Sequence, residues 1–255
     1  MIQKMKKHSF LFTELVKRDF KKKYKRTILG VFWSVLSPLL NLLVMSLVFT
    51  QFFGRSTPHY TIYLFAGNLV FGYYRESTNS GMQSLVSNAS IFKKINVPKY
   101  MFLLSKNASS LINFGLTLVV FFIFVAIDGI AFSWRFLLLL YPIACMVLFN
   151  MGVGLVLSAL YVFFKDIQYL YEVFTMLLMY CSAIFYTIDG YSPTVQMVFH
   201  CNPVYVYISY FRQIIIDGVI PSLPYHLLMA AYAALVLGLG FFIYKKYNHQ
   251  FLYYV

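Results

Sequence analysis

The chain has 255 residues, of which 60% are hydrophobic, 20% are aromatic and only 11% are charged. Because a soluble domain carries about 25% charged residues, this composition excludes a soluble globular protein and indicates an integral membrane protein. The net charge of +13 does not indicate nucleic-acid binding, since ten of the 21 Lys and Arg residues precede Thr27 in one basic segment. A basic segment beside a membrane span sets topology and contacts anionic membrane lipids.

A basic amphipathic helix is predicted first, over residues 9–26. An aromatic or branched apolar residue recurs every four positions from Phe12 to Tyr24, which places an apolar stripe on one face of the helix. Such a helix lies in the membrane interface. It leads directly into residues 27–53, which are almost uncharged and would form a helix about 39 Å long, enough to span a bilayer.

Five further segments are predicted to span the membrane, which makes six spans in an all-α fold with a single domain over 1–255. They are residues 60–82, 101–127, 135–163, 169–186 and 225–244. The second span contains Arg75 and Glu76, and each charge costs about 2.5–3.5 kcal/mol near the centre of a span. This span must therefore pack inside the bundle, or its charges must reach water.

Two shorter features interrupt the spans. Residues 88–98 are polar and basic and predict a short helix that Pro98 ends. Residues 188–221 are apolar but broken by prolines into helical pieces of about eight and fourteen residues, too short to cross a bilayer singly. These pieces predict a re-entrant hairpin, because non-helical backbone at membrane depth has to be surrounded by protein or by a water-filled cavity.

The distribution of basic residues predicts the orientation. With six spans and a cytoplasmic N-terminus, 17 of the 21 Lys and Arg residues lie on the inner side, and only Arg55, Arg135 and Arg212 lie on the outer side. The positive-inside rule favours this arrangement. We therefore expect a multi-pass protein of the bacterial cytoplasmic membrane, with both termini in the cytoplasm and the hairpin entering from outside.

Motifs of enzymes and metal sites are absent from the sequence. The five histidines lie far apart, and Cys145, Cys181 and Cys201 lack the spacing of a metal or redox site. We expect no catalytic residue, no metal ligand and no cofactor on this chain. A membrane-embedded enzyme remains an alternative, since folding can bring distant groups together.

Four stretches, in order along the chain, resemble one family of transporters. The first runs from Leu15 through Lys-Arg-Asp-Phe to Ser-Pro-Leu39, and the second is Ser87-Asn-Ala-Ser-Ile-Phe-Lys-Lys-Ile-Asn-Val-Pro98. The third is Phe163-Phe-Lys-Asp-Ile167, and the fourth is Asn202-Pro203 followed by Tyr210-Phe-Arg-Gln213. Together they resemble the permeases that export O-antigen and teichoic-acid polysaccharides with a separate ABC ATPase. The resemblance covers nearly the whole chain, and it specifies the family rather than the cargo.

The resemblance implies that the N-terminal helix and the 88–98 segment contact the ATPase, the latter as a coupling helix. The residues that match are Ile91, Phe92, Lys93, Lys94 and Ile95, braced by Lys17, Arg18 and Asp19. Alternatively, these lysines only fix topology and contact lipid headgroups. An apolar Ile91-Phe92 pair in a cytoplasmic loop otherwise lacks a purpose, which favours coupling.

The resemblance also implies a homodimeric channel lined by aromatic side chains. Candidates are Phe49, Phe52, Phe53, Tyr180 and Tyr186, although anchoring at the membrane interface or simple packing explains most aromatic residues in spans. Arg75 fits the pyrophosphate of a lipid carrier, and a structural ion pair with Glu172 is the alternative. In the hairpin, Asn202, Pro203 and Arg212 are candidates for a structural or gating role.

The resemblance and the residues together favour the channel-forming subunit of an ABC exporter. It would pair with itself and with two ATPase copies that bind ATP and Mg²⁺, and its cargo would be a polysaccharide on an undecaprenyl-pyrophosphate carrier. An ABC exporter of small molecules or drugs, and an ion-coupled secondary transporter, are the alternatives. The second of these would need inverted repeats and acidic residues at the midplane, which the sequence does not clearly show.

Overall fold

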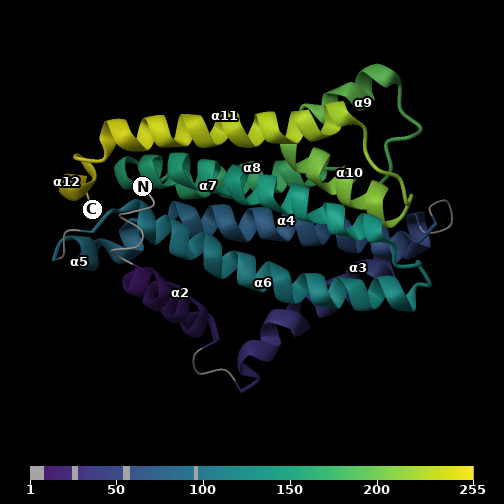
Figure 1. Cartoon of the computed structure of the whole chain (residues 1–255), viewed down its shortest axis with the longest axis horizontal. Helices are drawn as coiled ribbons and strands as arrows, with labels where there is room; N and C mark the ends of the chain where they lie inside the picture. Colours follow the sequence, from purple (N-terminus) through teal and green to yellow (C-terminus); the bar gives the residue numbers. More distant parts are fainter. Residues whose placement is uncertain (1–8, 25–27, 54–57, 95–96, 255) are drawn as a thin grey trace.

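The computed structural model describes residues 9–24, 28–53, 58–94 and 97–254. Within these ranges all regular structure is helical, and five long helices form an elongated bundle (Figure 1). The long helices are α3 (Trp33–Phe53), α4 (Tyr60–Met82), α6 (Tyr100–Ile127), α7 (Leu140–Phe163) and α11 (Leu223–Tyr247).

Four segments of the described chain are long and apolar enough to cross a membrane. They are Trp33–Thr50, Tyr100–Ile127, Trp134–Phe163 and Leu223–Tyr247. The other two predicted spans do not meet this measure. α4 has the length but carries Arg75 and Glu76, and α8 (Ile167–Tyr180) has only 14 residues.

The central helix of the bundle is α4, as its two charges require. Most of its side chains are buried, and it packs against α3, α6, α7, α8 and α10 (Pro203–Ile215). The polar face of α6 contacts it, since the Ser80 and Ser110 hydroxyl oxygens are 3.3 Å apart. Protein contacts therefore surround most of this polar span, while the face that carries Gly72 and Arg75 stays exposed.

Two glycines bring the backbones of α7 and α11 into contact. A Cβ atom at Gly152 would lie 2.5 Å from the Leu237 backbone nitrogen, and one at Gly240 would lie 2.6 Å from the Gly152 carbonyl oxygen. Small residues allow this close approach, which stabilises helix pairs in membranes through van der Waals contact. Gly154 has the same role toward α4, because a Cβ at Gly81 would lie 3.2 Å from the Gly154 Cα.

Several predicted boundaries differ from the structure, among them the starts of α7 and α11, which were predicted at residues 135 and 225. The helix of the first span begins at Trp33, after a 3-10 turn over Gly30–Phe32. The helix predicted over 88–98 is confined to α5 (Ala89–Phe92), preceded by a 3-10 turn at Val86–Asn88; residues 95–96 lie outside the described ranges. The fifth span was predicted to reach residue 186, but α8 ends at Tyr180 because side chains bind the carbonyl groups of the residues that follow.

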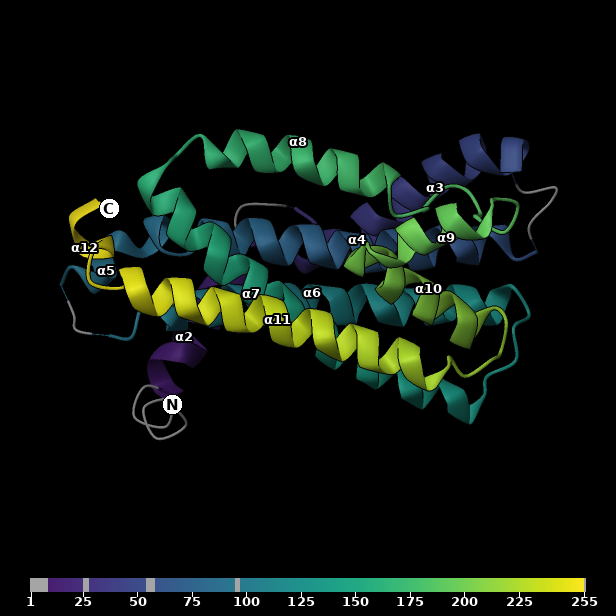
Figure 2. The ribbon, with the colours of Figure 1, turned by 90° about the horizontal axis from the view of Figure 1, so that it is seen from above.

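The remaining helices lie at the two ends of the bundle. The predicted hairpin pieces correspond to α9 (Pro193–His200) and α10, with 8 and 13 residues. A 3-10 helix at Trp134–Leu139 leads into α7. At the opposite end, α5 and the short α12 (Phe251–Tyr254) lie together in both views (Figures 1 and 2), and α2 (Ser9–Tyr24) packs on α6. We call the end that carries α5 and α12 the basal end.

Candidate functional site

A stripe of polar residues with one glycine runs along a single face of α4. Its members are three or four residues apart, so they lie on the same side of the helix. All of them line pockets beside α4. We call this set the α4 stripe: Asn68, Gly72, Arg75, Glu76, Asn79 and Gln83.

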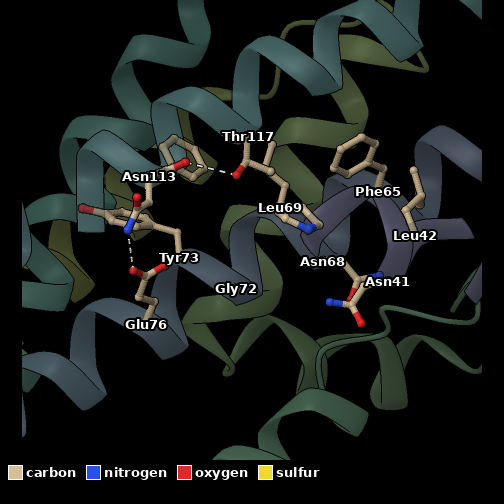
Figure 3. A pocket seen from close by; sticks show the side chains of 12 residues that line it. Asn41, Leu42, Phe65, Asn68, Leu69, Gly72, Tyr73, Glu76, Asn113 and Thr117 are labelled. Atoms are coloured by element: carbon tan, nitrogen blue, oxygen red, sulfur yellow. Dashed lines mark hydrogen bonds between the residues drawn. The ribbon is translucent and has the colours of Figure 1, made fainter. Parts of the chain in front are cut away.

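One part of the α4 stripe faces a pocket of about 140 Å³ between α3, α4 and α6 (Figure 3). Here Glu76 Oε1 accepts a hydrogen bond from Asn113 Nδ2 at 2.7 Å, and Asn113 in turn accepts one from Thr117 through its backbone oxygen. Asn41 and Asn68 also line this pocket. The Glu76 carboxylate is thus held by an amide from a neighbouring helix.

Arg75 lies in a different environment, in a pocket of about 370 Å³ between α4 and α8. Asn79 and Gln83 of α4 line the same pocket, with Glu172 and Thr175 from α8. The ion pairs of the described residues do not include Arg75, so the predicted pair with Glu172 does not form. Its side chain is exposed on the single copy of the protein.

Apolar faces of α3 and α8 flank the α4 stripe. Both helices contribute residues to its pockets, yet both also leave large apolar side chains uncovered. The stripe therefore lies at the bottom of a notch with apolar rims, which we call the α3–α8 notch. The uncovered side chains are Leu40, Leu43, Val44, Leu47 and Val48 on α3, and Leu170, Val173, Phe174, Leu177 and Tyr180 on α8.

The described channel-lining candidates lie close together around Phe185, whose ring centroid is 4.7 Å from that of Phe49 and 6.2 Å from that of Tyr180. Phe49 is partly buried and stacks on the Phe185 ring, and Tyr186 donates its hydroxyl to the Tyr180 carbonyl at 2.7 Å. Tyr180 is exposed at the end of α8. The side chains of Phe52 and Phe53 lie outside the described part of the structure. Of the described candidates, Tyr180 is the one that faces outward.

The non-helical segment 181–186 is held by side chains of other helices. Buried backbone carbonyls need hydrogen-bond donors, all the more where no water is present. Each donor here belongs to α4 or to the start or body of α10. Asn202 donates to the Cys181 oxygen, Arg212 to the Ala183 and Ile184 oxygens, Tyr60 to the Phe185 oxygen and Tyr63 to the Tyr186 oxygen.

Arg212 is the centre of this arrangement. It is only 6% exposed, and its guanidinium donates to the carbonyls of Tyr63, Ala183 and Ile184 and lies 3.3 Å from the Tyr63 ring centroid. Gly67 leaves room for it, since a Cβ there would lie 2.9 Å from Nη2. Ala183, with φ +48°, has the left-handed conformation that L residues avoid, and the Arg212 bond to its carbonyl helps to hold it there.

Asn202 and Pro203 begin α10 in the way their sequence predicts. The Asn202 side chain accepts a hydrogen bond from the Val204 backbone N–H at 3.0 Å, and Pro203 occupies the first helical position. Asn202 thus both caps α10 and holds the 181–186 segment. These contacts join the hairpin to the end of α8.

At the basal end, α2 is fastened to the segment that precedes α5. Arg18 Nη2 donates to Asn88 Oδ1 at 2.7 Å and to Asp19 Oδ1 at 2.8 Å, and Lys106 Nζ of α6 lies 3.3 Å from the same Asp19 oxygen. Asn88 is buried and precedes α5 without capping it, because its Oδ1 accepts from Arg18, while its amide donates to the Ser84 carbonyl. Lys17 pairs with Glu14 at the surface.

Within the predicted coupling segment, the apolar and basic residues separate. Phe92 is only 6% exposed and packs with Leu15 of α2 and with Phe102, so it is not free to enter a groove of another protein. Ile91 is partly buried against the same cluster. Packing within the chain thus accounts for the burial of Phe92, and contact of this segment with an ATPase stays a prediction. Lys93 and Lys94 are exposed, and Ile95 lies outside the described residues.

We expect Arg18 and Asn88 to be energetically coupled. Alanine at either position removes the same hydrogen bond, so the double variant should lose about 1 kcal/mol less stability than the two single losses added together. Thermal unfolding of the purified protein in detergent measures this. Lys17→Ala is the matched control, because Lys17 does not contact Asn88, and its effect should add to that of Asn88→Ala. Additive losses for Arg18 and Asn88 would contradict the contact.

The bundle and its site define a class of protein, namely a helical membrane protein with a polar stripe recessed between apolar helices. Comparison with protein families agrees with this, because residues 11–216 match the model of the ABC-2 type transporter family. The chain belongs to the ABC-2 type transporter family. It is therefore a membrane transporter subunit and not an enzyme, and its family implies an ATPase partner. The resemblance seen in the sequence is confirmed.

Similar proteins have matching lengths. A protein named O-antigen export system permease protein RfbA from Klebsiella pneumoniae is 28% identical over 245 residues, which cover 94% of this chain and 93% of the relative. A second from the same organism is 26% identical over 243 residues, with the same coverage. One from Myxococcus xanthus is 22% identical over 254 residues, 98% of this chain and 97% of the relative.

Proposed function

We propose that this chain is the channel-forming subunit of an ABC exporter for a cell-surface polysaccharide carried on undecaprenyl pyrophosphate. Two copies would form the channel in the bacterial cytoplasmic membrane, and two ATPase copies that bind ATP and Mg²⁺ would drive it. The observation that carries this proposal is the α4 stripe, recessed in the α3–α8 notch. The names of the relatives support the class of cargo.

Arg75 supports a water-filled path along α4. It lies within the second predicted span, is exposed on the single copy and has no ion-pair partner among the described residues. A charge that faces lipid near mid-span costs about 2.5–3.5 kcal/mol. This cost disappears if the notch holds water and a polar cargo instead of lipid. The apolar rims on α3 and α8 are then the surfaces that a second copy covers.

The α4 stripe is chemically suited to a sugar polymer with a phosphate-linked carrier. Amide and carboxylate groups exchange hydrogen bonds with sugar hydroxyls, and Asn79, Gln83 and Glu172 line one pocket with Arg75. The Arg75 guanidinium has the fork of donors that fits phosphate oxygens. Tyr180, exposed at the end of α8, adds an aromatic face for the C–H side of a sugar ring.

The basic residues support an orientation with the basal end in the cytoplasm. Lys93, Lys94, Lys245 and Lys246 are exposed there, and the positive-inside rule assigns such residues to the inner side. In this orientation the fifth predicted span crosses as α8 together with the 181–186 segment, and a second copy would cover the apolar face that α8 leaves exposed. The ATPase docks at the basal end, where the exposed Lys93-Lys94 turn follows the anchored α5. The α9–α10 hairpin then faces the outside, and Asn202, Pro203 and Arg212 stabilise the outer end of the channel.

Replacement of Arg75 tests the proposal. Arg75→Gln should lower polysaccharide export at least tenfold in cells that express the full transporter, because the carrier phosphate loses its cation. Arg75→Lys should keep part of the activity, since the charge remains without the fork. Surface polysaccharide is measured by immunoblot, and membrane yield and ATPase co-purification are checked for each variant.

Arg135→Gln is the matched control, since this arginine lies outside the α3–α8 notch, where it donates to the Gly218 carbonyl. Its export should stay close to the wild-type level. Normal export by Arg75→Gln would refute the role of the α4 stripe. Loss of a small-molecule export activity with unchanged surface polysaccharide would instead identify a different cargo.

A further inference from the structure

The C-terminal residues form a second structured element at the basal end, which the sequence analysis did not anticipate. α12 covers Phe251–Tyr254 and lies beside α5 in both views of the bundle (Figures 1 and 2). Phe251 is fully buried in a cluster that includes Leu85, Leu103 and Val162. Leu85 directly precedes the 3-10 turn that leads into α5. α12 therefore packs on α7, next to the turn that leads into α5.

Lys99 joins α12 to α5. Its ammonium donates to the Asn248 carbonyl and lies between two aromatic rings, 5.8 Å from the centroid of Phe92 and 5.7 Å from that of Phe251. A cation over an aromatic ring is attracted by the negative face of that ring, more strongly where it is shielded from water. Burial lowers the pKa of Lys99, in agreement with this shielded position. One side chain thus connects the predicted coupling segment with the C-terminal helix.

The outward side of α12 is apolar and aromatic. Leu252 and Tyr254 are exposed. Tyr253 is 85% exposed, more than any other tyrosine of the described residues. Lys245 and Lys246, at the end of α11, are exposed nearby in the chain. A surface complementary to this one would have an apolar depression surrounded by acidic residues.

The length of α11 places α12 outside the hydrocarbon layer, at the end of the bundle where the ATPase docks in the proposed function. α11 has 25 residues and is about 37 Å long, whereas the hydrocarbon layer of a bilayer is about 30 Å thick. Lys245 and Lys246 in its last turn mark the headgroup level. α12 follows after three more residues and folds back under the bundle beside α5. α12 therefore lies at the same end of the bundle as α5, which the Lys93-Lys94 turn follows (Figures 1 and 2).

We propose that α12 is a second docking element for the ATPase subunit and that Lys99 links it mechanically to α5. This inference rests on the proposed function, in which the ATPase docks at the basal end. Leu252 and Tyr253 would contact the ATPase directly. Movement of the ATPase would then reach α5 through Phe251, Lys99 and Phe92 as well as through the Lys93-Lys94 turn.

Site-specific photocrosslinking in the full complex tests this proposal. A photoreactive phenylalanine analogue replaces Tyr253 in one variant, Lys94 in a second, and Tyr191 in a control at the opposite end, where Tyr191 is 49% exposed. We expect crosslinks to the ATPase from positions 253 and 94 and none from position 191. A crosslink from 94 without one from 253, or a crosslink from 253 to lipid, overturns the role of α12 and leaves coupling intact. If neither position 253 nor position 94 crosslinks to the ATPase, the ATPase does not dock at the basal end, and the proposal is overturned.

A lysine variant tests the link itself. Lys99→Met keeps the length of the side chain but removes the ammonium, and we expect it to reduce the yield of the 253 crosslink by more than half. Lys165→Met is the matched control, because Lys165 lies 4.8 Å from the Tyr161 ring centroid and so loses a comparable contact elsewhere. An unchanged yield in Lys99→Met would show that Lys99 does not position α12.

Discussion

Arg212→Met is expected to destabilise the protein by about 3 kcal/mol or more. The variant keeps most of the volume of the side chain but removes the guanidinium that donates to the carbonyls of Tyr63, Ala183 and Ile184, of which Ala183 keeps only the Tyr63 hydroxyl at 3.3 Å. Each buried group left unsatisfied costs about 1–3 kcal/mol, and bonds to charged donors are at the upper end. Such a loss should lower the unfolding midpoint in detergent by about 6–12 °C, as measured by differential scanning fluorimetry.

Arg135→Met is the appropriate comparison for stability. Arg135 also donates to a backbone carbonyl, that of Gly218, but it is only partly buried. Its replacement should shift the midpoint by a few degrees at most. Equal shifts for both arginines would show that Arg212 is solvated and does not hold the 181–186 segment.

Gly152→Val is expected to prevent normal assembly of the bundle. A Cβ atom at this position would lie 2.5 Å from the backbone nitrogen and 2.7 Å from the Cα of Leu237, and backbone atoms cannot rotate away as a side chain can. α7 and α11 would have to separate along their whole contact, so we expect a loss of well over 3 kcal/mol, beyond the usual cost of overpacking. The yield of monodisperse protein from detergent-solubilised membranes measures this.

Gly238→Val in α11 separates the effect of the clash from the effect of losing a glycine. Nothing lies within 4 Å of a Cβ at Gly238, so valine there adds a side chain to an open surface of the same helix. This variant should be recovered at the wild-type yield. Equal recovery of Gly152→Val would contradict the direct backbone contact between α7 and α11.

Sequence patterns predicted the long helices well because length and hydropathy determine them. The α4 helix was predicted with its observed bounds, Tyr60–Met82, and α6 differs by one residue at its start. Turn chemistry was equally informative for α10, where Asn202 and Pro203 define the first turn locally. These features depend on residues close together in the chain.

The errors arose where distant residues decide the backbone. Nothing between residues 177 and 186 signals that α8 ends at Tyr180, since the donors that bind the 181–186 carbonyls come from α4 and α10. The burial of Phe92 could not be predicted from its own segment, because it depends on Leu15, which lies far earlier in the chain. The spacing of polar residues along α4 indicates the α4 stripe in the sequence. That α3 and α8 lie on either side of the stripe depends on the fold and is not visible in the sequence.

In the proposed channel, the length of α8 would limit the extent of the narrow part. With 14 residues α8 extends about 21 Å, roughly two thirds of the hydrocarbon thickness. Beyond Tyr180 the wall consists of the 181–186 segment and α9, whose Val195, Met197 and Val198 are uncovered. In a channel built from two copies, a polymer would therefore contact the wall closely only along the inner two thirds of the membrane. It would leave through a wider outer vestibule. A shorter narrow part would lower the number of sugar units whose contacts with the wall must break at each step of export.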